Sequence, residues 1–107
     1  MIMIVTDLQN RVNKFIEENG LETSLETRLL DLLSEVGELA KATLKGTNYG
    51  KESFEVTDAW RDEFGDVLFA IFVLAKQTDV SVEDALLAAL KKYEGRIKSS
   101  GEVGSDR

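Results

Sequence analysis

The chain has 107 residues, the size of one domain, and 43% of them are hydrophobic, which is enough to bury a core. Asp and Glu number 20 against 13 Lys and Arg, and the resulting formal charge of -7 disfavours binding to nucleic acid, whose backbone is a polyanion. Cysteine and histidine are both absent, which excludes disulfides, thiol nucleophiles and zinc sites built on thiolate or imidazole. Chemistry must therefore come from carboxylates, hydroxyls, Lys and Arg.

No stretch of the sequence approaches the roughly 20 apolar residues that cross a membrane. The longest apolar run, Val67 to Ala75, is followed at once by Lys76. The first residues lack a basic segment and meet Asp7 directly, so a signal peptide is not expected. We therefore expect a soluble cytoplasmic protein that binds neither membranes nor nucleic acid.

Apolar residues recur with helical spacing along almost the whole chain, and no proline interrupts them. Four helices are predicted. The first begins at Thr6 and ends at Asn19-Gly20, and the second begins at Ser24 and ends at Gly46. The third begins at Thr57 or Asp58, and Ser81 caps a fourth that runs from Val82 to about Lys98. Short connections between four helices predict an all-α antiparallel bundle. We expect this domain to span residues 1–98, with residues 99–107 as a flexible tail.

The third helix is apolar on every side between Val67 and Ala75. Helices of this kind are buried all round, and a chain this short can hardly surround one of its own. We therefore expect an oligomer in which a second subunit covers Phe69, Phe72 and Val73; a modest exposed patch is the alternative. The core face expected for the second helix is Leu25, Leu29, Leu32, Leu33, Val36, Leu39 and Ala40. That expected for the third helix is Trp60, Phe64, Val67, Leu68, Ile71, Leu74 and Ala75.

The second and third helices each carry two carboxylates three residues apart, with a glycine between them. The pairs are Glu35 with Glu38, around Gly37, and Glu63 with Asp66, around Gly65. Residues at this spacing share a helix face, so all four carboxylates can line one seam if the two helices pack together. An all-oxygen ligand set favours Mg²⁺ or Mn²⁺. The alternative is a solvated acidic face. The glycines indicate close approach of another helix or a ligand.

Glu35-x-x-Glu38 followed by Glu63-x-x-Asp66 resembles the all-α nucleoside triphosphate pyrophosphatases, in particular the MazG-like group. The segment from Lys92 to Arg96 is similar to the family's Lys-Asn-x-x-Arg pattern. Two positions depart from the family's motifs: Ser34 stands where a leading Glu is common, and Tyr93 stands where the family has Asn.

The resemblance implies Mg²⁺-dependent cleavage of a nucleoside triphosphate to a monophosphate and pyrophosphate, a reaction suited to cleaning the nucleotide pool. It implies Glu35, Glu38, Glu63 and Asp66 as metal ligands, and a homodimer or homotetramer with sites near subunit contacts. Either Glu35 or Glu38 is the candidate catalytic residue that orients the attacking water. Lys92 and Arg96 are the candidate phosphate-binding residues, although basic residues near a helix C-terminus also favour its dipole.

Two other functions stay open: a non-catalytic interaction or regulatory module with the same fold, and a different nucleotide phosphohydrolase. Trp60 has the spacing of a core residue, with base stacking as the alternative. The loop-side lysines, Lys41, Lys45 and Lys51, are further phosphate-binding candidates, for which surface solubility is the commoner explanation.

Overall fold

The structure is a computed structural model that describes residues 4–101. Within this range the chain forms four helices and no strand: α1 (Val5–Glu18), α2 (Leu25–Gly46), α3 (Asp58–Thr78) and α4 (Val82–Ser100). The predicted all-α class is therefore confirmed. None of the four described helices combines the length and apolarity that a membrane crossing requires. Helix α4 ends at Ser100, two residues beyond Lys98, and is capped by Gly101 in the left-handed conformation. Residues 102–107 of the expected tail lie outside the described residues.

Hydroxyl side chains cap the N-termini of three of the helices, as the sequence predicts. Ser24 accepts the backbone N–H of Thr27, Thr57 accepts that of Trp60, and Ser81 accepts that of Asp84, each at 3.1 Å. These bonds satisfy amide groups that have no acceptor within the helix.

Helix α1 begins earlier than predicted, because the cap is formed in a different way. Its N-cap is Ile4, whose N–H donates to the carboxylate of Asp7 at 3.2 Å. Thr6, expected as the N-cap, lies inside the helix, and its hydroxyl donates to Glu83 of α4 at 3.3 Å. A carboxylate in the first turn thus satisfies the free amide from within the helix.

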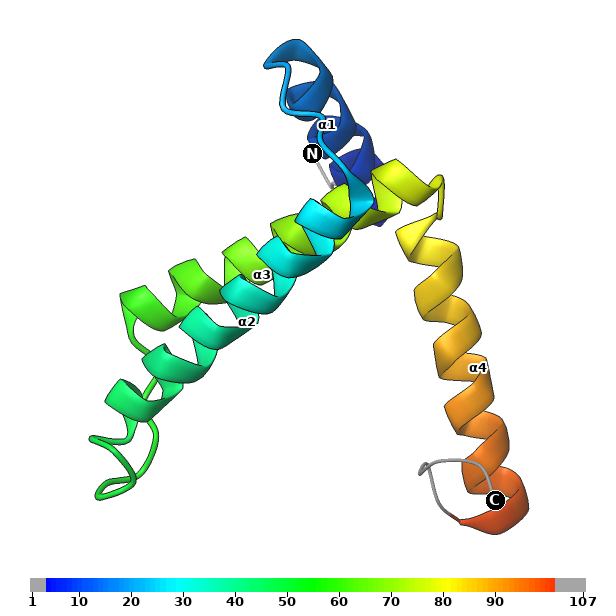
Figure 1. The fold of residues 1–107 in the computed structure, drawn as a ribbon. Helices are drawn as coiled ribbons and strands as arrows, with labels where there is room; N and C mark the ends of the chain where they lie inside the picture. The colour runs from blue at the N-terminus through cyan, green and yellow to red at the C-terminus, as the bar shows by residue number, and fades with distance from the viewer. Residues whose placement is uncertain (1–3, 102–107) are drawn as a thin grey trace.

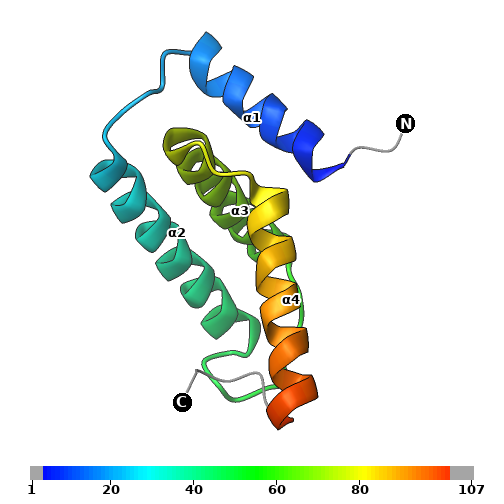
Figure 2. The ribbon, with the colours of Figure 1, turned by 90° about the vertical axis from the view of Figure 1, so that its right-hand side faces the viewer.

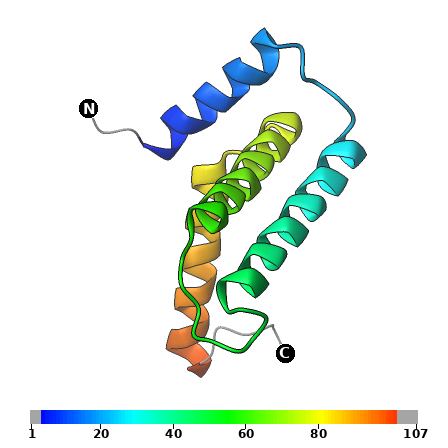
Figure 3. The same cartoon turned by 90° about the vertical axis from the view of Figure 1, so that its left-hand side faces the viewer.

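Helices α2 and α3 run side by side in opposite directions and form the main body of the chain (Figures 1 and 3). Helix α1 packs against α3 and α4 (Figure 2). The side-chain amide of Gln9 in α1 donates to the carbonyl of Phe72 at 3.0 Å, and Lys76 pairs with Glu17 at 3.5 Å. Helix α4 leads away from the α2–α3 pair, so the four-helix arrangement is open within one chain (Figure 1).

The buried core of this open chain is small, and it consists of the apolar residues Ile16, Ala42, Ala70, Val73 and Ala75. Most of the core face expected on α2 is exposed, with Leu33 at 67%. The same holds for Phe64, Leu68 and Ile71 of α3. The reason is the direction of α4, which does not close over the α2–α3 pair.

The residues expected beneath a second subunit divide into two groups. Val73 is only 2% exposed within the chain itself, so the expectation that it needs a partner is wrong. Phe69 is exposed and makes an edge-to-face contact with Phe15 of α1, with ring centroids 6.0 Å apart. Phe72 is half-buried and lines an apolar cavity of about 540 Å³ between α3 and the start of α4, which also includes Leu32 and Leu86.

Candidate metal centre

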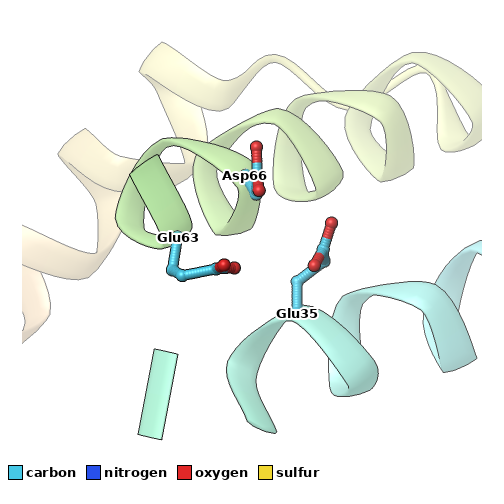
Figure 4. Close-up of side chains that lie close together, drawn as sticks. All are labelled: Glu35, Glu63 and Asp66. Atoms are coloured by element: carbon cyan, nitrogen blue, oxygen red, sulfur yellow. The ribbon is translucent and has the colours of Figure 1, made fainter. Parts of the chain in front are cut away.

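Three carboxylates meet where the middle of α2 faces the first half of α3. Glu35 projects from α2 toward Glu63 and Asp66, which lie one turn apart on α3 (Figure 4). One oxygen from each group lies within 4.8 Å of the other two, and all three side chains are half-buried. Two oxygens on opposite sides of one Mg²⁺ are about 4.2 Å apart, so small side-chain movements suffice for all three to bind one ion.

The electrostatics of this cluster favour a bound cation. Partial burial raises the pKa of Glu35 above its ordinary value, and the negative charge of Asp66 raises it further. The pKa of Glu63 is raised by the same two causes in the same order. Removing carboxylates from water and placing them together disfavours their charged forms, and a divalent cation reverses both effects.

Glu38 lies at the edge of this cluster and is not one of the three convergent carboxylates. Its side chain is exposed, yet its charge is near enough to raise the pKa of Glu35 and of Glu63. Asp31 was not predicted as part of the site, and its charge adds to the repulsion that raises the pKa of Glu35. Its position one turn before Glu35 was a usable signal.

Lys92 and Arg96, the predicted phosphate-binding residues, lie on α4. Both pack against the Tyr93 ring, with the Lys92 Nζ 4.9 Å and the Arg96 Cζ 5.5 Å from its centroid. Because α4 leads away from α2 and α3, a single chain does not bring these cations to the carboxylate cluster (Figure 1).

Gly37 and Gly65 lie in open positions. A Cβ at either residue would meet nothing within 4 Å among the residues that the structure describes. The close approach expected at these glycines is therefore not made by another helix of the same chain.

Trp60 packs as part of an aromatic group with Phe54 and Phe64. Its ring stacks on Phe64 at 5.2 Å, meets Phe54 edge-to-face at 5.6 Å, and its indole N–H donates to Thr43 at 2.9 Å. These contacts tie the loop between α2 and α3 to both helices, which favours a structural role for Trp60 over base stacking.

The family model of the MazG nucleotide pyrophosphohydrolase domain matches residues 23–100. This chain belongs to the MazG family. The matched segment contains α2, α3 and α4, and with them all three convergent carboxylates of the MazG domain. The membership supports a nucleotide pyrophosphohydrolase activity.

A protein of Bacillus subtilis is similar to this chain in both sequence and structure. The uncharacterized protein YpjD of Bacillus subtilis (strain 168) is 31% identical to this MazG chain over 97 residues, which cover 86% of this chain and 85% of YpjD. The crystal structure of YPJD from Bacillus subtilis, a protein proposed to be a pyrophosphatase, has a TM-score of 0.74 at 27% identity, and the match covers 87% of this chain and 97% of that one.

The raised carboxyl pKa values predict how the stability of this MazG domain changes with pH. Without metal, the folded state holds protons on Glu35 and Glu63 more tightly than the unfolded state does. The protonated side chains therefore stabilise the folded state below the ordinary carboxyl pKa. This contribution to the free energy of unfolding is lost as pH rises through the raised pKa values of Glu35 and Glu63. We therefore expect Glu35→Gln to melt above the wild type at pH 7 in a chelating buffer, with a difference that shrinks toward pH 4.

With saturating Mg²⁺ or Mn²⁺, the wild type should instead melt above Glu35→Gln. The ion binds the folded state, so the wild-type melting temperature should rise by roughly 5–10 °C at pH 7 and by less near pH 5, where protons compete. Glu35→Gln should lose this rise, and Glu22→Gln, at an exposed carboxylate outside the cluster, should keep it. A wild-type melting temperature that is indifferent to both ions would contradict the metal site.

Proposed function

We propose that this protein is a Mg²⁺-dependent nucleoside triphosphate pyrophosphohydrolase, with Mn²⁺ as a possible substitute ion, that converts ribo- or deoxyribonucleoside triphosphates to monophosphates and pyrophosphate. The observation that carries the proposal is the convergence of Glu35, Glu63 and Asp66 within the MazG domain. Removal of unwanted nucleotides from the pool suits this reaction. A cytoplasmic location is part of the same proposal, because nucleoside triphosphates are made and used there.

The four carboxylates divide two tasks in this proposal. Glu35, Glu63 and Asp66 hold the ion, which lowers the pKa of a water and neutralises phosphate oxygens when bound. Glu38, at the edge of the cluster, orients the attacking water and accepts its proton. The water oxygen then bonds to the α-phosphorus, and the bond from that phosphorus to the bridging oxygen breaks, which releases pyrophosphate.

We further propose that the protein acts as a homodimer or homotetramer. Apolar side chains of α2, α3 and α4 are exposed around the open side of the chain, including Leu33, Leu68 and Leu86. So many exposed apolar side chains favour an interface, and copies of the chain would cover them. Assembly would also offer Lys92 and Arg96 a route to a carboxylate cluster, where they would bind substrate phosphate.

A substrate panel tests the proposed activity. Canonical and modified nucleoside triphosphates would be incubated with the protein and Mg²⁺, and pyrophosphate and orthophosphate would be measured separately. We expect pyrophosphate with little orthophosphate, and no product from Glu63→Gln. Orthophosphate as the main product would indicate a different phosphohydrolase. Absence of turnover with metal binding intact would indicate a non-catalytic module.

A further inference from the structure

A small cavity of about 100 Å³ lies between the second half of α2 and the beginning of α3, next to the metal centre. Its lining consists of Glu38, Lys41, Ala42, Lys45, Thr57, Ala59 and Glu63. Glu63 belongs to both the cavity and the three-carboxylate cluster, so the two features adjoin. A ligand held at Glu63 would therefore lie next to the cavity.

Lys41 and Lys45 give one wall of this cavity two positive charges. They lie four residues apart on α2, a spacing at which like charges repel. The ion pairs within residues 4–101 lie elsewhere, at Lys14, Arg61 and Lys76, so neither cavity lysine has a carboxylate partner in the described structure. An anion placed between them would relieve the repulsion and gain two charge-assisted hydrogen bonds.

The start of α3 also borders the cavity, through Thr57 and Ala59. Thr57 caps the helix by accepting the N–H of Trp60, while the first amide groups of a helix have no acceptor within it. The helix dipole is positive at this end, which also favours an anion. The cavity thus has a cationic side formed by Lys41 and Lys45, and an acidic side formed by Glu38 and Glu63.

We propose that Lys41 and Lys45 bind the β- and γ-phosphates of the substrate, the part that leaves as pyrophosphate; this inference rests on the proposed function. The acidic side requires a metal ion between it and a phosphate, whereas the lysine side binds phosphate directly. A triphosphate lying across the seam therefore has its α-phosphate at the carboxylate cluster and its two terminal phosphates at the lysines. This order directs cleavage to the α–β anhydride and favours triphosphates over shorter nucleotides.

Binding of inorganic pyrophosphate tests this assignment without relying on turnover. Titration calorimetry with Mg²⁺ would compare the wild type with Lys41→Ala, Lys45→Ala and the double variant. Each single variant should bind pyrophosphate about tenfold more weakly, because one charge-assisted contact is lost, and the double variant more weakly still. Lys14→Ala, at an exposed lysine of α1, should bind as the wild type does. Circular dichroism would show that the helices are retained.

The outcomes separate this inference from the proposed function. Wild-type affinity for pyrophosphate in the double variant, or no pyrophosphate binding by the wild type, would overturn the lysine assignment. An unchanged KM for a hydrolysed triphosphate in the double variant would do the same and leave the activity standing. Lysine-dependent pyrophosphate binding without hydrolysis of any nucleotide would support the anion site and reject the activity.

Discussion

Replacing Asp66 by Asn is expected to lower the turnover of a nucleoside triphosphate by roughly 10²- to 10³-fold. Asp66 is one of the three convergent carboxylates, and its charge is the largest electrostatic cause of the raised pKa of both Glu35 and Glu63. Asparagine has the same shape without the charge, so the helices should form while the ion is held more weakly. The loss should therefore appear in kcat/KM at limiting Mg²⁺ and be only partly restored by excess ion.

The neighbouring acidic residue Asp62 offers a matched control. It lies on the same helix and is exposed, outside the three convergent carboxylates, so Asp62→Asn should retain turnover within about threefold. In the metal-free protein, NMR titration should show that Asp66→Asn lowers the pKa of Glu35 toward its ordinary value. Wild-type turnover in Asp66→Asn would reject this cluster as the catalytic metal site.

Replacing Leu86 by Asp is expected to dissociate the proposed assembly into single chains. Leu86 is 54% exposed, lies on α4 and lines the apolar cavity beside α3. If another copy covers this surface, the substitution buries a charge without a partner, which is strongly unfavourable. Sedimentation at micromolar concentration should show an oligomer for the wild type and a monomer for Leu86→Asp.

Leu87→Asp provides the comparison, because it makes the same substitution on the same helix at a residue that is 50% exposed. Leu87 is turned about 100° from Leu86 and does not line the cavity, so this variant should stay assembled. A monomeric wild type, or equal dissociation by both variants, would reject the cavity as the site of assembly.

The helices, and the carboxylates that share a face of α2 or α3, were predictable because their signals are local. Apolar spacing and the hydroxyl caps Ser24 and Ser81 act within a few residues, so they predict helices whatever the rest of the chain does. The glycine and carboxylate spacing also pointed to the family. The predicted cap of α1 was wrong even at this range, because the Asp7 carboxylate accepts the N–H of Ile4 and the helix begins before Thr6.

The sequence by itself determined the four helices, the absence of imidazole and thiol ligands, and which carboxylates share a helix face. Only the tertiary structure decided that Glu38 lies outside the three convergent carboxylates, and that Lys92 lies on a helix that leads away from them. It also brought Lys41 beside the start of α3. The physical reason is that helix formation depends on short-range backbone hydrogen bonds, whereas the direction of each helix depends on packing between residues far apart in the chain.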